Sequence, residues 1–453
     1  MDEAIMAEHP SVKAENGKLL HILGVGFGLA VAMGGTVGVG ILRNPGGVAE
    51  QIGSFWLIML AWLLGGVYCL LNANHVAELA AMIPRAGGFY AYTEQAFGRY
   101  GGFVVGWSDW MNNVLALAFI SVVFGEYASA LFAPDLYGGR ILFSLLVLIS
   151  MAALNWIGVR TGSGTQKITS LLKAAALLVF VVACFIFGGR SSMGGVPVAA
   201  ASSSAPSLFA GLTAFILAFQ MVLSTYDGWY GPVYFSEENE DPSRSLPRSL
   251  FGGIALIAAI YLLVNLALLY VLPMEQLAGS TFAGGDAMSL MFGERSGQVL
   301  TIMALLSLIG IINSILMSCP RILFGLGRDG LCSEQTMKVN RGGTPSVALL
   351  GTLLIACILT SIGTFELLLG IGAFFIAVIM VLVVIAFFVL RLREPETPRP
   401  FVAWGYPYIP GLILVSASLL CIGYVVSNPW PSLYAMIALA LSYPVFRGLF
   451  SNR

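Results

Sequence analysis

Two stretches of glycine and polar residues interrupt long apolar segments of this chain. They are Gly34-Gly35-Thr36-Val37-Gly38-Val39-Gly40 and Ser224-Thr225-Tyr226-Asp227-Gly228-Trp229. In lipid every backbone N–H and C=O needs a partner, so an interrupted helix is tolerated only where it lines a cavity whose contents replace the lost hydrogen bonds. One interruption in each half of the chain therefore predicts a binding site between two broken membrane helices.

The two breaks would offer opposite charges to a bound molecule. Free N–H groups at the start of a half-helix, with the partial positive charge of the helix dipole, suit a carboxylate. Unwound carbonyls at the second break suit a cation, so the pair would select a zwitterion. The alternative for the first stretch alone is a small-residue packing face of the G-x-x-x-G kind.

The composition indicates an integral membrane protein. Of 453 residues, 58% are hydrophobic and 10% are charged, and the mean hydropathy is +0.88. This composition contains too few polar residues to cover the surface of a soluble protein. The net charge of -1 argues for neither nucleic acid nor an acidic surface partner. The polar first twenty residues show no signal peptide, and six solitary cysteines indicate packing rather than a metal or a disulfide.

A window of about 20 apolar residues predicts twelve membrane-spanning segments. They lie near residues 22–50, 54–81, 102–133, 140–159, 166–189, 207–236, 249–272, 297–325, 346–363, 365–390, 408–427 and 431–449. With the amino terminus in the cytosol, 17 of the 22 lysines and arginines fall on cytosolic loops and four outside, while Lys173 lies within a span. This distribution follows the rule that positive residues accumulate on the cytosolic side, so both termini are expected there.

Segments 1 and 6 are each about 30 residues long, roughly 45 Å at helical rise, which exceeds the thickness of the lipid core. Because the breaks lie at similar depth in these two segments, five-segment repeats of opposite orientation are expected. The expected parts are a cytosolic tail (1–20), a first repeat (21–190), a second repeat (207–391), two further segments (408–449) and a cytosolic end (450–453).

Four motifs follow one another along the chain. The first is Gly35-Thr36-Val37-Gly38-Val39-Gly40-Ile41-Leu42. The second joins Ala77-Glu78-Leu79 to Ile83-Pro84-Arg85-Ala86-Gly87-Gly88-Phe89-Tyr90-Ala91-Tyr92. The third runs from Tyr226-Asp227-Gly228-Trp229 through Glu237-Glu238 to Pro247-Arg248, and the fourth is Arg393-Glu394-Pro395-Glu396 with Arg399-Pro400. In this order they resemble the amino acid, polyamine and organocation superfamily, and within it the branch of L-type amino acid exchangers. The resemblance implies an all-α membrane protein with 12 transmembrane helices and a 5+5 inverted-repeat, LeuT-like core in which helices 1 and 6 are discontinuous.

The resemblance also implies roles for the residues of the breaks. The substrate's α-carboxylate would bind the N–H groups of Val39 and Gly40, where glycines at 38 and 40 permit close approach. The α-amino group would bind carbonyls at Thr36, Ser224, Thr225 and Asp227. Tyr226 and Trp229 would form an aromatic wall, or pack without contacting substrate. The Asp227 carboxylate could attract a cationic side chain or cap the following half-helix.

Lys173 is the one lysine at membrane depth, and such a residue indicates function by default. The resemblance implies that its ammonium bridges segments 1 and 8, in place of a sodium ion. Alternatively its side chain could reach the cytosolic surface, or it could take up and release a proton and couple transport to a proton gradient.

Other polar residues have open roles. Asp109, Asn112 and Asn113 in segment 3, with Asn313 and Ser314 in segment 8, could line the pathway or only bridge helices. Glu78, His75 and Glu126 are expected to be interfacial or paired. Glu237 and Glu238 beside Arg244 and Arg248 suggest an ionic contact on the inner side, although solvated surface pairs would give the same pattern.

The resemblance implies a sodium-independent secondary transporter of L-α-amino acids in the cell membrane, working by alternating access as an exchanger or a proton symporter. A polyamine or cationic amino acid transporter of the same superfamily is the alternative. A channel would need a continuous polar file, and a membrane enzyme would need clustered acids or histidines; the sequence shows neither. A transporter-derived sensor remains possible from sequence. No cofactor, metal or nucleic acid is expected; an amino acid and the lipid bilayer are the expected partners, and the sequence does not determine an accessory subunit.

Overall fold

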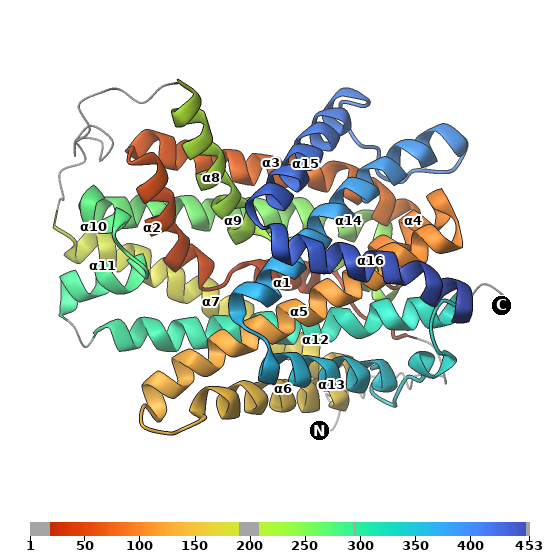
Figure 1. Ribbon diagram of the computed structural model, residues 1–453, viewed down its shortest axis with the longest axis horizontal. Helices are drawn as coiled ribbons and strands as arrows, with labels where there is room; N and C mark the ends of the chain where they lie inside the picture. The colour runs from red at the N-terminus through yellow and green to blue at the C-terminus, as the bar shows by residue number, and fades with distance from the viewer. Residues whose placement is uncertain (1–18, 190–207, 294–295, 450–453) are drawn as a thin grey trace, which may run out of the picture.

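The chain folds into helices joined by loops in the computed structural model, which describes residues 19–189, 208–293 and 296–449 (Figure 1). Within these ranges, extended backbone pairs at two isolated β-bridges. Most of the predicted tail 1–20, the predicted end 450–453, and the boundaries of the predicted repeats at 190 and 207 lie outside the described residues.

Each of the twelve predicted segments coincides with a helix or a pair of helical elements. The helices of the first half are α1 (Val25–Thr36), α2 (Gly40–Ile52), α3 (Phe55–Met82), α4 (Phe89–Phe97), α5 (Arg99–Phe132), α6 (Gly139–Ile157) and α7 (Val159–Phe187). Those of the second half are α8 (Leu208–Tyr226), η2 (Gly231–Glu238), α9 (Pro242–Val271), α10 (Met274–Ala278), α11 (Ala283–Phe292), α12 (Gly297–Arg328), η4 (Glu334–Met337), α13 (Ser346–Ile362), α14 (Phe365–Arg393), α15 (Tyr408–Ser427) and α16 (Pro429–Leu449). Short helices α10 and α11 were not predicted, because neither is long or apolar enough to register as a span.

Within the described ranges, nine spans are long and apolar enough to cross a membrane, and the bent pair α1–α2 makes a tenth. One of the nine joins α8 to η2. Helix α13 has 17 residues and is shorter than the others, and α16 is outside this set.

Both predicted interruptions are present in the backbone. Helix α1 ends at Thr36 and α2 begins at Gly40, with a bend of 48° between them. Helix α8 ends at Tyr226, and a turn with Gly228 at φ +101° follows. That conformation strains any residue with a Cβ, so glycine at 228 is what permits the turn. The element after the second break is the 3-10 helix η2 instead of an α-helix.

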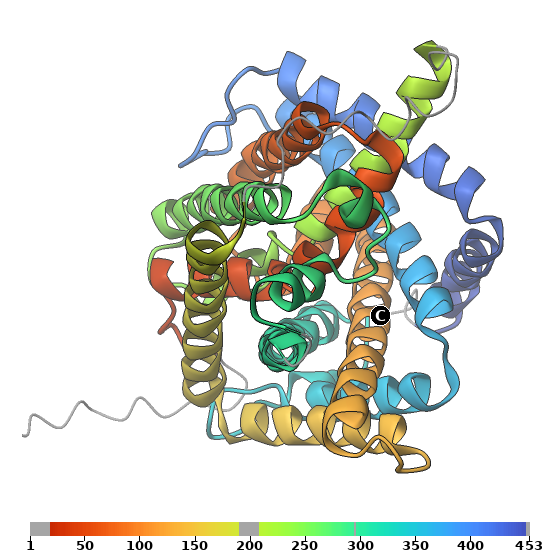
Figure 2. The same ribbon diagram turned by 90° about the vertical axis from the view of Figure 1, so that its left-hand side faces the viewer.

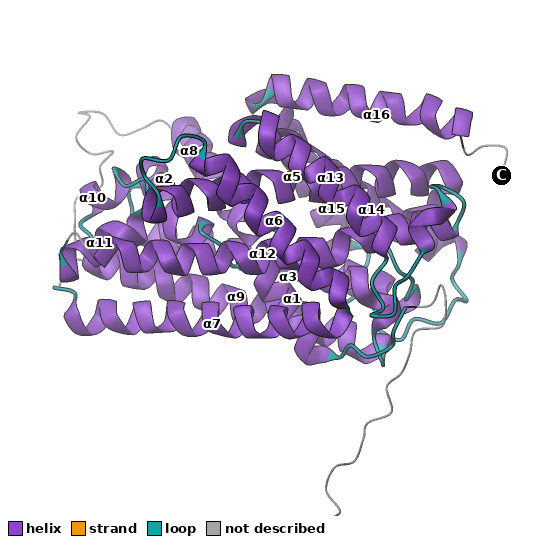
Figure 3. Cartoon of the chain, turned by 90° about the horizontal axis from the view of Figure 1, so that it is seen from below, coloured by secondary structure: helices purple, strands orange, loops and turns teal. Residues whose placement is uncertain are grey.

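The long helices pack side by side around the centre, with α5 against α12 and α14, and α3 against α9. Helix α1 packs against α7, α9 and α12, while α2 packs against α8. Figure 2 shows the same packed helices turned by 90°, with α5 and α7 running down the picture. Helices α10 and α11 lie at one end of the molecule and α4 at the other (Figure 1). Figure 3 shows α16 on the edge opposite α7.

Buried polar side chains hold the helices together. Asn313 of α12 donates to Gln166 Oε1 of α7 at 2.7 Å and accepts from Asn155 Nδ2 of α6 at 2.9 Å. Ser170 of α7 donates to the Ala30 carbonyl of α1 at 2.7 Å. Asn313 therefore bridges helices, which resolves its open role.

Glu78 of α3 binds the segment that follows α14. It accepts from Arg399 Nε at 3.0 Å, forms an ion pair with Arg391, and accepts from the Ala403 N–H at 2.7 Å. The fourth motif is thus part of a buried structural contact. Glu126 pairs with Arg140 at 3.7 Å on an exposed surface. Both glutamates are paired, as expected.

Candidate functional site

A cavity of about 610 Å³ lies where the two breaks meet α3, α5, α12, α14 and α15. A concave, mostly apolar cavity with a few convergent polar groups is the usual form of a small-molecule site. The predicted binding residues that line it are Thr36, Gly38, Val39, Gly40, Ser224, Thr225, Tyr226, Asp227, Gly228 and Trp229. Val37 does not line it: its side chain is fully buried, and its carbonyl points to Lys173.

The start of α2 presents free backbone donors. The helix begins with Val39 as its N-cap, and no side chain caps it. Among the described residues, no backbone carbonyl accepts from the N–H groups of Val39 or Gly40. A Cβ added at Gly40 would lie 3.3 Å from Thr225 Cγ2, so the glycine keeps the approach to these donors open. This geometry suits an anionic group.

The two breaks touch each other. A Cβ at Gly228 would lie 2.8 Å from the Gly35 carbonyl oxygen, closer than real Cβ atoms come to other atoms. Tyr261 of α9 places its hydroxyl oxygen 3.0 Å from both the Thr36 and the Thr225 carbonyl oxygens. A tyrosine hydroxyl has one hydrogen, so it donates a hydrogen bond to one of these two carbonyls at a time while lying within reach of both.

Tyr261 changes the predicted set of acceptors for a cation. The carbonyls of Thr36 and Thr225 already face a donor, whereas those of Ser224 and Asp227 accept from no described residue. The sequence did not single out Tyr261, because a tyrosine inside a long apolar helix carries no signal of which helices its hydroxyl joins.

Asn44 is a second residue that sequence reasoning missed. Its Nδ2 donates to Thr225 Oγ1 at 2.7 Å and thereby links α2 to α8. It lies one turn beyond Gly40, so the same face of α2 carries both residues into the cavity. That spacing was the available signal.

The aromatic residues have distinct surroundings. Tyr226 donates its hydroxyl to the Trp62 carbonyl at 3.0 Å and packs against the rings of Trp62 and Tyr261. Trp229 packs edge-on against Tyr230 at 5.6 Å between ring centroids. Both predicted aromatics line the cavity and also pack against neighbouring rings.

The cap alternative for Asp227 is wrong. The N-cap of η2 is Tyr230, and no side chain caps that helix, because the turn places Asp227 three residues too early. The Asp227 side chain is instead exposed to the cavity. A carboxylate at this position adds negative charge to the wall.

Lys173 lies between α1 and α12. Its Nζ donates to the Gly34 carbonyl at 2.8 Å and to the Val37 carbonyl at 2.9 Å, and the residue is 1% exposed. A Cβ at Gly310 of α12 would lie 2.8 Å from Nζ. The alternative in which this side chain reaches the cytosolic surface is therefore wrong, because its ammonium ends on the carbonyls of the first break.

The polar residues of α5 and α12 divide into two groups. Asn112, Asn113 and Ser314 line the cavity. Asp109 lies behind them and accepts from Tyr234 at 2.7 Å. Tyr234 lines the cavity as well, so Asp109 is one side chain away from it.

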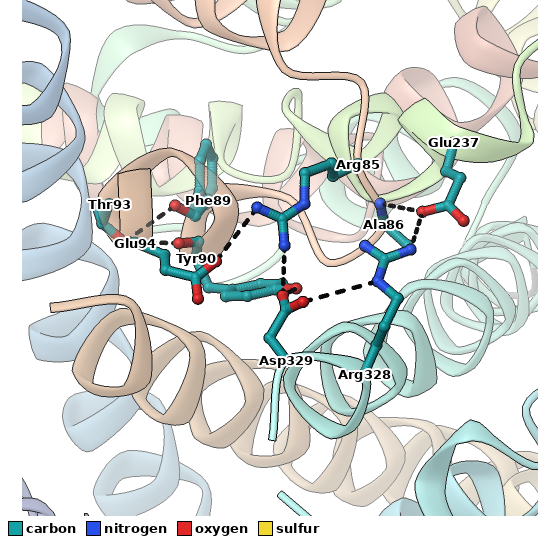
Figure 4. A network of polar contacts seen from close by, with 9 residues as sticks. All are labelled: Arg85, Ala86, Phe89, Tyr90, Thr93, Glu94, Glu237, Arg328 and Asp329. Atoms are coloured by element: carbon teal, nitrogen blue, oxygen red, sulfur yellow. Dashed lines mark hydrogen bonds and ion pairs between the residues drawn. The ribbon is translucent and has the colours of Figure 1, made fainter. Parts of the chain in front are cut away.

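A network of ion pairs joins α4, η2 and the end of α12 (Figure 4). Asp329 Oδ2 accepts from Arg85 Nη2 at 2.5 Å and from the Tyr90 hydroxyl at 2.6 Å. Arg85 also pairs with Glu94 at 3.2 Å. Burial raises the pKa of the Glu94 carboxyl, and the charge of Asp329 raises it further. We call this group, with Arg328 and Glu237, the inner network.

The partners predicted for Glu237 and Glu238 are wrong. Glu237 accepts from Arg328 Nη1 at 2.7 Å, and Glu238 pairs with the buried Arg321 at 2.8 Å. The predicted partners Arg244 and Arg248 are exposed on the first turns of α9 and line a separate groove. Proximity in sequence misled the prediction, because the observed partners lie on α12, 83 and 91 residues further along the chain.

The described residues contain no group of three or more His, Cys, Asp or Glu side chains that could hold a metal ion. All six cysteines are free.

Three curated proteins are similar to the chain over most of its length. The Serine/threonine exchanger SteT of Bacillus subtilis is 27% identical over 96% of this chain and 98% of its own. The b(0,+)-type amino acid transporter 1 of Mus musculus is 25% identical over 94% and 87%, and the Asc-type amino acid transporter 1 of Mus musculus is 28% identical over 94% and 80%. Their names are those of transporters and not of enzymes.

The family model described as amino acid permease matches residues 28–443. This range contains both breaks, the cavity, Lys173 and the inner network. It agrees with the all-helical fold and with the apolar spans that make this a multi-pass membrane protein. Since the match covers nearly the whole sequence, the chain belongs to the amino acid permease family of the amino acid, polyamine and organocation superfamily.

Proposed function

We propose that the protein carries L-α-amino acids across the cell membrane by alternating access, independently of sodium, as an exchanger or a proton symporter. The observation that carries the proposal is the cavity between the two breaks, with free N–H donors at Val39 and Gly40 on one side and open carbonyls at Ser224 and Asp227 on the other. A carboxylate and an ammonium on the same small molecule would complete both sets.

The proposed architecture has twelve spanning helices, with both termini in the cytosol. Segments α1 to α7 (21–190) would form one repeat and α8 to α14 (207–391) the inverted second repeat, followed by α15 and α16 (408–449). Ten spans of the described residues are long and apolar enough to cross a membrane. Helices α13 and α16 would raise the number to twelve. The similar position of the break in α1–α2 and in α8–η2 supports this arrangement.

Sodium independence is supported by the position of Lys173. Its ammonium already satisfies the Gly34 and Val37 carbonyls, so a positive charge is supplied there by the protein itself. The conformation described here would be open to the outside. The cavity extends past the breaks to Arg43 and Gln220, whereas the inner network joins α4, η2 and α12 on the opposite side.

Transport of cationic amino acids or polyamines is a second candidate function. The Asp227 carboxylate faces the cavity and would pair with a cationic side chain. Alternating access by the same scaffold would serve either class of substrate.

The test is a counterflow panel of neutral and cationic amino acids in proteoliposomes, run with the wild type and with Gly40→Val. The valine methyl groups would fill the space in front of the free N–H donors, so we expect exchange and binding to be lost. Gly26→Val is the matched control, because a Cβ at Gly26 of α1 meets no other atom within 4 Å. Undiminished exchange by Gly40→Val, with Gly26→Val also active, would place the substrate elsewhere.

A further inference from the structure

Asp109 of α5 is a buried acid in the middle of a membrane helix. It is fully buried and lies ten residues from the start of α5 at Arg99, about 15 Å along the helix. Its Oδ1 accepts from the Tyr234 hydroxyl at 2.7 Å and from Asn113 Nδ2 at 3.1 Å. Its Oδ2 has no hydrogen-bond partner among the described residues.

Among the described residues, no cation balances this carboxyl group. Asp109 forms no ion pair with a lysine or arginine of the described ranges. The titratable groups that interact with it electrostatically are Asp227, Tyr230, Tyr234 and Cys319. No charged residue of α4, α6, α12, α13 or α14 in the described part is among them. An ionised carboxylate with one oxygen unpaired is costly in this surrounding, and a bound proton removes the charge.

The group is connected to the cavity through its hydrogen-bond partners. Both Tyr234 and Asn113 line the cavity, so a proton from the water of the cavity has one layer of side chains to pass. The Tyr234 bond also joins η2, which follows the second break, to the unbroken helix α5. An ionised carboxylate accepts a stronger hydrogen bond than a protonated one, so protonation would loosen this contact between the two parts.

We propose that Asp109 is a proton-binding site whose protonation controls the contact between η2 and α5 and thereby makes transport depend on pH. The inference rests on the proposed amino acid transport. The proton is taken up from water at acidic pH and returned to water at alkaline pH, so no further reactant is needed.

Lys173 is a different case from Asp109. Its ammonium has two carbonyl acceptors, whereas Asp109 carries an acceptor atom with no donor. The pH dependence proposed here therefore belongs to Asp109.

The experiment compares counterflow in proteoliposomes at acidic and alkaline pH for the wild type, Asp109→Asn and Glu126→Gln. Asparagine has the shape of the protonated acid and carries no charge at either pH. We expect Asp109→Asn to keep exchange and to lose the pH dependence that the wild type shows. Glu126→Gln is the matched control, since this acid lies on the same helix but is exposed and paired with Arg140; it should retain the wild-type pH profile.

A second variant keeps the proposal testable if Asp109→Asn does not fold. Tyr234→Phe removes the donor to Oδ1 and leaves the acid in place, so the ionised form loses a hydrogen bond and the midpoint of the pH profile should move upward. A wild type whose exchange does not respond to pH, or an Asp109→Asn variant with the wild-type profile, overturns the inference. A Tyr234→Phe midpoint that stays in place does the same. Absence of amino acid exchange by the wild type at every pH would instead overturn the proposed function.

Discussion

Replacing Lys173 by methionine removes the only described donor to two carbonyls of the first break. The Gly34 and Val37 oxygens accept from its Nζ at 2.8 and 2.9 Å. Methionine is unbranched and of similar length, so it fills the same space beside Gly310 without a donor. The substitution therefore tests the ammonium and leaves the packing nearly unchanged.

The expected magnitude follows from the number of acceptors left without a partner. A buried acceptor that loses its donor costs about 1–3 kcal/mol, so two cost about 2–6 kcal/mol. The backbone of the break can avoid this cost by rotating its carbonyls toward other donors, which displaces the free N–H groups of Val39 and Gly40. At the lower bound of about 2 kcal/mol, substrate affinity falls about 30-fold.

The assay is equilibrium binding of a radiolabelled amino acid to purified protein, with thermal unfolding measured in the same preparation. Lys167→Met is the matched control, because Lys167 lies on the same helix, α7, with an exposed side chain. We expect wild-type affinity from Lys167→Met. Wild-type affinity from a folded Lys173→Met protein would refute the reasoning, since the break would then hold its shape without the ammonium.

Three further substitutions test the site and the inner network. Gly228→Ala places a Cβ 2.8 Å from the Gly35 carbonyl oxygen at φ +101°; we expect loss of exchange, because the left-handed backbone alone costs about 1–2 kcal/mol. Tyr261→Phe releases the carbonyls that it holds at 3.0 Å and should weaken substrate binding about fivefold, for a hydrogen bond of about 1 kcal/mol; unchanged affinity would exclude a positioning role. Asp329→Asn removes the charge that binds Arg85, so thiol reagents added from the inner side should label a single cysteine introduced in the cavity faster than in wild type; equal rates would separate the inner network from gating.

The sequence predicted the positions of the helices because lipid imposes a simple rule. Each span must satisfy its own backbone over about 30 Å, so apolar length marks a helix whatever surrounds it. The same rule made the breaks visible, since glycine and polar residues at membrane depth need a reason to be there. The residues lining the cavity around Gly40 and Trp229 followed directly from this pattern.

The pattern of apolar and polar residues could not predict contacts between segments that are far apart in the sequence. Glu237 was assigned to the neighbouring Arg244 and pairs with Arg328 instead, and Asp227 was considered as a helix cap but faces the cavity. In both cases the choice depends on which helix passes nearby, and hydropathy contains no information about neighbours.

The chain by itself determined that there are two interrupted membrane helices and which residues interrupt them, because those properties depend on local backbone chemistry and on apolar length. The tertiary structure alone decided that Tyr261 joins the two breaks, and it excluded the alternative in which Lys173 reaches the surface. It likewise decided that one oxygen of Asp109 has no donor among the described residues. These facts depend on side chains from helices far apart in sequence meeting within hydrogen-bond distance, which is fixed by how the helices pack.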